Sequence, residues 1–133
     1  MFTAALTDAM QPRLRGPRTQ PEHAARRRLE RLVKAYVQEC SAGRTPARVS
    51  ELAQRFKTSA SYLSRSAAEV LGRQLRAALR EEQLAIAEHL LRTTTLPVAE
   101  IAVLSALGTP STFYRAFRRA FGCGPTEYRQ RKR

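Results

Sequence analysis

The sequence predicts an all-α protein built around a duplicated pair of helices. Apolar residues recur at spacings of three and four along most of the 133 residues, which is the period of an amphipathic helix. No segment alternates with period two for long enough to form a strand. A two-helix pattern in the middle of the chain recurs near its end, so we expect two copies of one helical unit.

The first 20 residues differ from the rest of the chain. Residues 1–20 hold Pro12, Gly16 and Pro17 among arginines and show little helical period. We expect a flexible basic leader here, which serves either as an arm on a polyanion or as a solvated tail. Residues 21–133 are expected to form the folded part of the chain.

Two helices are predicted next. The first runs from Glu22 to about Gly43, where the apolar pattern stops. Its inward positions are Leu29, Leu32, Val33, Tyr36, Val37 and Cys40. Pro46 fits the first turn of a second helix, with Thr45 as its cap. The inner face of that second helix would hold Val49, Leu52, Ala53 and Phe56.

A third helix is predicted to begin after Thr58 and Ser59, either of which can cap it, and to end at Gly72. A long helix over about 73–91 follows.

Prolines mark the remaining helices. Pro97 opens a fifth helix, and Thr109 with Pro110 supplies a cap and a first-turn proline for a sixth. A last short helix begins near Pro125. The aromatic positions of this part recur at helical spacing, which indicates core packing more than a platform for stacking single-stranded bases. They are Phe113, Phe117, Phe121 and Tyr128.

The internal repeat joins the second and third predicted helices to the fifth and sixth. The matched stretches are Glu51-Leu52-Ala53 with Glu100-Ile101-Ala102, Ser61-x-Leu63-x-Arg65 with Ser111-x-Phe113-x-Arg115, and Leu71-Gly72 with Phe121-Gly122. We therefore predict two helix-turn-helix subdomains, each a homeodomain-like three-helix unit, over 21–72 and 92–133, joined by a connecting helix over 73–91. The alternative is a helical bundle in which the repeat is accidental.

The charge of the chain points to a polyanionic partner. There are 24 Lys and Arg against 11 Asp and Glu, a formal net charge of +13 at pH 7, which favours nucleic acid. Of these cations 21 are Arg, whose planar guanidinium binds guanine edges and phosphates through paired hydrogen bonds. Codon usage in a GC-rich genome would also explain the excess of Arg.

The connecting helix sets the distance between the two subdomains on such a partner. Roughly 18 residues at 1.5 Å each give about 27 Å, while successive turns of a DNA duplex are about 34 Å apart. A monomer could therefore place the second helix of each subdomain in adjacent major-groove segments, bending the DNA to reach both.

Other classes of protein are disfavoured. Cys40 and Cys123 are too few for a disulfide framework and lie in no metal-ligand spacing. The opening apolar residues lack the basic stretch of a signal peptide, and no run approaches the roughly 18 apolar residues that span a bilayer. We expect no bound metal, no membrane partner, and a place in the bacterial cytoplasm at the nucleoid.

No catalytic site can be assembled from the residues present. His23 and His89 are far apart, Asp8 in the leader is the single Asp of the chain, and no Gly-rich phosphate loop occurs. We expect neither enzymatic activity nor a cofactor.

One long stretch of the second subdomain is distinctive. It consists of Leu90-Leu91-Arg-Thr-Thr-Thr-Leu-Pro-Val-Ala-Glu-Ile101-Ala102 followed by Ser111-x-Phe113-x-Arg115-x-Phe117-Arg118-Arg119-x-Phe121-Gly122-x-x-Pro125-x-Glu127-Tyr128-Arg129. On these residues the chain, over about 25–131, resembles the AraC/XylS transcription regulators. Ser59-x-x-x-Leu63-Ser-Arg65 with Gly72 resembles the first recognition helix of that family more loosely.

The resemblance implies a DNA-binding domain of two helix-turn-helix subdomains joined by a long helix. It implies a regulator of transcription that binds double-stranded promoter DNA and contacts RNA polymerase, and we expect it to bind as a monomer. There is no room here for the N-terminal ligand-sensing domain of larger members, so the resemblance is to stand-alone members or to the end of a longer regulator.

The chain departs from the family pattern at several positions. Lys57 and Ala106 stand where the family usually has Gly, so each must adopt a positive φ or the turn must be rebuilt. Ala67 replaces a usual aromatic, and Gln83 stands where Arg is common. Ala68-Glu69 stands where Lys is frequent, and Leu107 follows Ala106 where Gly-Phe is typical. These changes weaken the first subdomain most, so we expect the second to be the better DNA reader.

Candidate contact residues follow from the helical face opposite the core. Thr112 and Arg115 are one turn apart with Ser111 beside them, so all three point away from the Phe113 side towards a groove. The base-contact candidates are Ser61, Ser64 and Arg65 in the first subdomain and Ser111, Thr112 and Arg115 in the second. The phosphate-contact candidates are Thr109, Arg118 and Arg119.

The sequence therefore predicts a sequence-specific, double-stranded DNA-binding transcriptional regulator. Two alternatives stay open. A non-specific architectural protein for DNA or RNA would need only the charge, and a protein-interaction module derived from the same fold would have lost DNA reading.

Overall fold

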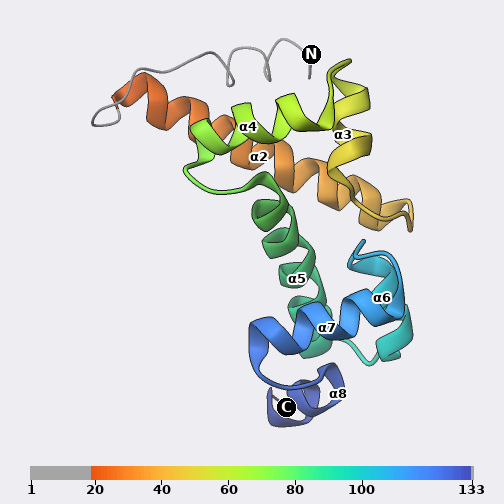
Figure 1. Cartoon of the computed structure of the whole chain (residues 1–133). Coiled ribbons are helices and arrows are strands. Elements are labelled where there is room, and N and C mark those ends of the chain that lie inside the picture. Colours follow the sequence, from red (N-terminus) through yellow and green to blue (C-terminus); the bar gives the residue numbers. More distant parts are fainter. Residues whose placement is uncertain (1–18, 133) are drawn as a thin grey trace. The chain divides into compact units, whose positions relative to one another are not determined.

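The computed structural model describes residues 19–132, and all of the regular elements there are helices (Figure 1). They are α2 (Gln20–Ala42), α3 (Val49–Arg55), α4 (Ala60–Leu71), α5 (Leu75–Thr93), α6 (Val98–Leu104), α7 (Pro110–Phe121) and α8 (Pro125–Lys132). The predicted all-α class is confirmed. The predicted leader over 1–20 lies outside the described residues except for its last two positions.

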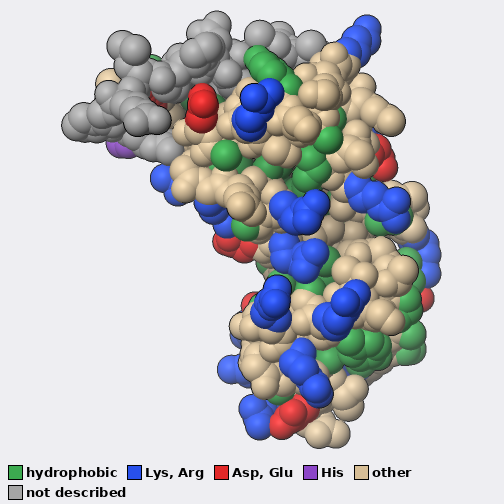
Figure 2. Space-filling model, viewed as in Figure 1, with side chains coloured by type: hydrophobic (Ala, Val, Ile, Leu, Met, Phe, Trp, Pro, Cys, Tyr) green, Lys and Arg blue, Asp and Glu red, His purple; other side chains and the backbone are tan. Residues whose placement is uncertain are grey.

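The helices form two compact units. Among the described residues, the first unit contains residues 19–36 together with Arg48–Leu79, and the second contains Val37–Ala47 together with residues 80–132. The subdomain borders expected near residues 72 and 91 remain predictions. The surface shown in Figure 2 carries many more Lys and Arg side chains than Asp and Glu, as the net charge of +13 requires.

Helix α2 begins with a capping box that the sequence reasoning missed. The backbone N–H of Thr19 donates to Glu22 Oε2 at 2.7 Å, and the N–H of Glu22 donates to Thr19 Oγ1 at 3.3 Å. These two bonds satisfy N–H groups that the first turn of a helix leaves without intrahelical partners. They explain why α2 starts at Gln20.

The start of the second predicted helix was wrong. α3 begins at Val49, not at Pro46, and its N-cap residue Arg48 makes no side-chain cap bond. The hydroxyl of Tyr36 instead holds the residue before the helix, accepting from Arg48 N and donating to Arg48 O, both at 3.1 Å. Thr45 serves the preceding helix, because its N–H and Oγ1 both donate to Cys40 O.

The caps of the two duplicated helices are confirmed. Ser59 Oγ accepts from Tyr62 N at the start of α4, and Thr109 Oγ1 accepts from Thr112 N at the start of α7, where Pro110 occupies the first turn. Both helices end on a glycine in the left-handed conformation, Gly72 with φ 74° and Gly122 with φ 76°. The repeat seen in the sequence therefore includes the residues that cap both ends of each of these helices.

The two helix-turn-helix turns keep their left-handed residues although neither is glycine. Lys57 has φ 55° and Ala106 has φ 63°, so the turns are not rebuilt around the substitutions. A side chain in this region places Cβ close to the following carbonyl, which costs about 1 to 2 kcal/mol. The second turn is one residue longer than the first, and the additional residue is accommodated with Gly108 at φ 95°.

Lys57→Gly is expected to raise the free energy of unfolding by about 0.5 to 1 kcal/mol, because glycine removes the Cβ clash and gives part of the gain back as chain entropy. Urea denaturation followed by far-ultraviolet circular dichroism measures the change. The matched control is Gln54→Gly in α3, where φ is helical and the same replacement should destabilise by about 1 kcal/mol. Equal effects of the two substitutions would contradict the left-handed turn.

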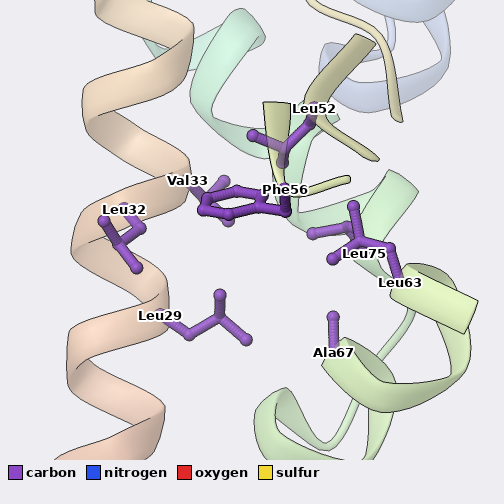
Figure 3. A pocket seen from close by; sticks show the side chains of 8 residues that line it. All are labelled: Leu29, Leu32, Val33, Leu52, Phe56, Leu63, Ala67 and Leu75. Atoms are coloured by element: carbon purple, nitrogen blue, oxygen red, sulfur yellow. The ribbon is translucent and has the colours of Figure 1, made fainter. Parts of the chain in front are cut away.

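The cores of the two units differ in how well they are filled. In the second unit the ring centroids of Phe117 lie 4.4 Å from Phe121 and 5.4 Å from Tyr128. In the first unit Ala67 stands where the repeat has Phe117, and an apolar cavity of about 10 Å³ remains there. Figure 3 shows its lining side chains, which are Leu29, Leu32, Val33, Leu52, Phe56, Leu63, Ala67 and Leu75.

This cavity is a packing gap, since about 10 Å³ is at the lower limit for a single water and far below the volume of an organic ligand. The aromatic residues predicted as core are confirmed in that role. Phe113 and Phe117 are 0% exposed, Tyr128 is 7% exposed, and Phe121 packs against the same cluster.

Ala67→Leu should destabilise the chain less than Ala116→Leu does, because part of the larger side chain enters the gap. Ala116→Leu, in the filled core of the second unit, should destabilise by about 1 to 3 kcal/mol through overpacking. Chemical denaturation of both variants against wild type tests the pair. A larger loss at position 67 than at 116 would show that the gap does not exist.

Candidate nucleic-acid interface

The second unit presents α7 as a two-sided helix. Phe113 and Phe117 are fully buried, which turns the opposite side of the helix to solvent. At 100° per residue, Ser111, Arg115 and Arg118 share one exposed row on that side. Two further candidates lie in the adjacent row, Thr112 half-buried and Arg119 exposed. The predicted contact residues of this unit therefore lie on one surface, which we call the α7 face.

The α7 face is electropositive along its length. The helix contains Arg115, Arg118 and Arg119 and no Asp or Glu among its residues. No ion pair joins these arginines to a carboxylate within residues 19–132. Figure 2 shows Lys and Arg side chains spread over the part of the second unit that carries α7. Such a surface attracts a polyanion without first having to break internal pairs.

Arg115 is held in place by its own helix. Its Nε donates to Ser111 O at 3.4 Å, a weak bond to a carbonyl in the first turn. The bond directs the guanidinium towards the N-terminal half of α7 and leaves the two terminal nitrogens for an external acceptor. This is the half of a recognition helix that contacts base edges.

Thr109 and Thr112 form a small hydroxyl pair at the start of α7. Their Oγ1 atoms are 2.9 Å apart, and Thr109 Oγ1 also accepts from Thr112 N at 3.2 Å. When Thr112 donates across the pair, the Thr109 proton can reach a phosphate outside. The candidate role of Thr109 in phosphate contact thus depends on which hydroxyl donates.

Tyr114 belongs to this surface and was missed in the sequence. Its side chain is 44% exposed and stands edge-on to Phe113, with ring centroids 5.5 Å apart. It lies on the flank of the row formed by Ser111 and Arg115. An aromatic residue inside an amphipathic helix is usually core, and only the burial of Phe113 and Phe117 on the other side shows that Tyr114 points outward.

The first unit presents α4 in the same way but with less charge. Ser61 and Arg65 are exposed, Ser64 is half-buried, and Tyr62 is 52% exposed. The positions that repeat Arg118 and Arg119 hold Ala68 and Glu69 instead. With one Arg and one Glu, α4 has no net charge, whereas α7 carries three cations.

The helix-turn-helix turn of the second unit is held by Gln83 of α5. This side chain is 4% exposed, and its Nε2 donates to Ala106 O at 2.8 Å and to Ala47 O at 3.3 Å. Ala47 N donates to the same Ala106 oxygen at 2.9 Å. Gln83 is therefore a buried hydrogen-bond donor to the left-handed turn, although Arg is common at this position in the family that the chain resembles.

An ion pair closes the same region at the surface. Both terminal nitrogens of Arg44 donate to the carboxylate of Glu100 on α6, with Nη2 3.1 Å from Oε2. The hydrogen bond from Arg44 lowers the pKa of Glu100 below its ordinary value, and Glu100 raises the pKa of Arg44. The segment after α2 is thereby tied to the first helix of the helix-turn-helix pair.

Behind α7, the short helix α8 is anchored to α5. The hydroxyl of Tyr128 donates to the carboxylate of Glu88, and Arg129 Nε donates to Leu91 O at 3.4 Å. Burial, followed by the hydrogen bond to Glu88, raises the pKa of Tyr128 to about 12. The phenol consequently stays protonated in the folded chain at pH values where a free tyrosine ionises.

Tyr128→Phe should lower the free energy of unfolding by about 1 to 2 kcal/mol near pH 7, because the bond to the Glu88 carboxylate is lost. The unfolded pKa of tyrosine is about 10, so this stabilisation is full below pH 10 and falls between pH 10 and 12. Urea denaturation of both proteins across this range measures the difference. A difference that stays constant up to pH 12 would argue against the hydrogen bond.

Other kinds of site are not found in the part of the chain that the structure describes. No group of three or more His, Cys, Asp or Glu side chains there could hold a metal ion. No helix among residues 19–132 is long and apolar enough to cross a membrane.

Each unit thus offers one capped helix whose outer side is polar, preceded by a short helix and a tight left-handed turn. This is the architecture of a helix-turn-helix DNA-binding protein. Comparison with known proteins gives the same class, since a model of the helix-turn-helix domain family matches residues 52–131.

Two curated relatives belong to one family of regulators. The chain is 42% identical over 65 residues to the transcriptional activator RclR of Escherichia coli, covering 49% of this chain and 23% of RclR. It is 34% identical over 86 residues to the regulatory protein SoxS of Salmonella typhimurium, covering 65% of this chain and 80% of SoxS.

Solved structures show the same fold. The C-terminal domain of AraT, a response regulator from Geobacillus stearothermophilus, matches with a TM-score of 0.67 and 28% identity over 86% of this chain and 88% of that domain. The DNA-binding domain of AdpA, solved in complex with a target DNA, matches with a TM-score of 0.65 and 25% identity over 77% of this chain and 90% of that domain.

The chain belongs to the AraC-type family of helix-turn-helix transcription regulators. The resemblance that its second subdomain carries is confirmed, and with it the prediction of a DNA-binding regulator.

Proposed function

We propose that this chain regulates transcription by binding double-stranded promoter DNA with α7 in the major groove and Arg115 at a base edge. The observation that carries the proposal is the α7 face, an exposed row of Ser111, Arg115 and Arg118 on a helix without acidic residues. A bidentate guanidinium to guanine is the commonest specific contact in the major groove.

The polar residues of the α7 face divide into two roles. Ser111, Thr112 and Arg115 lie in the N-terminal half and are proposed to read bases. Arg118 and Arg119 lie one turn further along. These two arginines, and Thr109 at the N-cap, are proposed to hold phosphates. Phosphate contacts fix the register of the helix on the duplex, and base contacts choose the sequence.

The helix α4 is proposed to enter a second major-groove segment with Ser61, Ser64 and Arg65. Its net charge of zero means that it contributes less to affinity than α7 does. Tyr62, half-exposed on the same helix, offers an apolar ring for contact with a thymine methyl group.

The wider setting is also a proposal. The chain acts as a monomer in the bacterial cytoplasm at the nucleoid, contacts RNA polymerase, and catalyses no reaction. Support comes from the relatives, since RclR is named a transcriptional activator and the AdpA domain was solved on a target DNA.

Arg115→Ala is expected to weaken binding to a selected promoter duplex by about 1 to 3 kcal/mol and to leave binding to a scrambled duplex unchanged. Fluorescence anisotropy of both duplexes at two salt concentrations measures this. Equal losses of affinity on the two duplexes would show that Arg115 does not read a base.

Arg119→Ala serves as the control for a phosphate contact. It should weaken both duplexes alike and reduce the salt slope of log K by about 1. Arg65→Ala is the counterpart in the first unit, and a loss smaller than that of Arg115→Ala is expected from the lower charge of α4.

A non-specific architectural role is the second candidate, and the net charge of +13 favours it. It predicts that wild type binds selected and scrambled duplexes with nearly equal affinity. A preference of about a thousandfold for the selected duplex would rule it out. Binding to duplex DNA no tighter than the charge alone predicts would instead indicate an interaction module.

A further inference from the structure

A row of basic side chains runs along the outer side of α2, away from α4 of the same unit. Arg27, Arg31 and Lys34 are all exposed, and at 100° per residue they fall within about 60° of one another. Along the helix axis they are spaced by about 6 and 4.5 Å. We call these three residues the α2 row.

The cations of the α2 row have no partner within residues 19–132. None of the three makes an ion pair or hydrogen bond there. The nearest acidic residues on α2 are already engaged, Glu30 by Arg26 at 2.9 Å and Glu22 by the backbone of Thr19 at 2.7 Å. The row is therefore an open electropositive surface of the first unit.

The α2 row and the outer side of α4 face in opposite directions within this unit. Figure 3 shows Leu29 and Val33 of α2 and Leu63 of α4 converging on the same apolar gap. Arg27 and Arg31 each lie about 160° around the helix from Leu29. A duplex held by α4 would therefore leave the α2 row exposed to solvent.

The chemistry of the row favours nucleic acid over a protein partner. The exposed large apolar side chains of the described residues are Tyr62, Val103 and Tyr114, and none of them lies on α2. Protein interfaces depend on a buried apolar or aromatic centre, which the row lacks. Closely spaced cations without such a centre suit the phosphate backbone of duplex DNA.

We propose that the α2 row is a second, sequence-independent site for duplex DNA, so that one chain can hold two DNA segments at once. The proposal rests on the proposed function only for the first segment, which the recognition helices hold. The second segment is bound through its phosphates alone.

The test is a bridging experiment. A selected promoter duplex is immobilised, the full chain is loaded and excess protein is removed, and a scrambled duplex is passed over while its capture is recorded by surface plasmon resonance. Wild type is expected to capture the second duplex with a strong dependence on salt. Native mass spectrometry of the same mixture should show one chain with two duplexes.

The decisive variant is Arg27→Ala with Arg31→Ala. Capture of the second duplex should weaken at least tenfold, and its salt slope should become shallower by about 1.8, which corresponds to two phosphate contacts. Loading on the first duplex should stay within about twofold of wild type.

The matched control is Arg55→Ala with Arg131→Ala, which removes the same charge from two arginines outside α2 that are paired with Glu51 and Glu127. It should capture the second duplex as wild type does. Equal losses in the two double variants, or no loss in the first, would overturn the proposal. Capture of poly-glutamate but not of duplex, dependent on Arg27 and Arg31, would overturn it in favour of an acidic protein partner.

Failure of the proposed function gives a different result. A chain that does not prefer the selected duplex fails in the loading step, and its loading on an immobilised scrambled duplex then tests the α2 row in the same way.

Discussion

The burial of Phe113 and Phe117 is the constraint on which the α7 face depends. Both rings are fully buried in a cluster with Leu91 of α5, Ile101 of α6 and Tyr128 of α8. Because a helix has only one orientation that hides both rings, the remaining polar residues must point outward. The cap at Thr109 fixes where the helix starts and therefore which turn carries Arg115. The orientation of the α7 face is thus a consequence of the core, and its polar residues add chemistry to an orientation already set.

Local chemistry explains most of what the sequence predicted correctly. Ser59 and Thr109 were predicted as caps because an N-cap bond joins residues only three apart, and such local bonds can be predicted from the sequence. The start of α3 could not be predicted because it depends on the hydroxyl of Tyr36, which is 12 residues from Arg48 along the chain. Tyr114 was missed because its exposure follows from how the whole cluster packs.

Family expectation was least informative at the turns. The absence of glycine left open whether the turns would change, and the structure keeps the left-handed residue in both. Ala106 is tied on its carbonyl side by Gln83 and Ala47. A backbone conformation with an unfavourable φ persists where surrounding bonds determine it, and here those bonds come from α5 and from the segment after α2. The contact residues themselves were chosen from helical spacing, and their roles await the binding measurements.

The gap beside Ala67 has a consequence for how readily the first unit opens locally. A core that lacks the contacts of an aromatic ring loses less dispersion energy when it opens, so the free energy of local opening is lower in the first unit than around Phe117. The backbone amide hydrogens of the first unit should be the first to exchange with solvent. This unit would also gain the most order when another molecule binds to its surface. A duplex lying on α4 would be such a molecule, so that ordering of the first unit and binding of DNA to α4 would become one event.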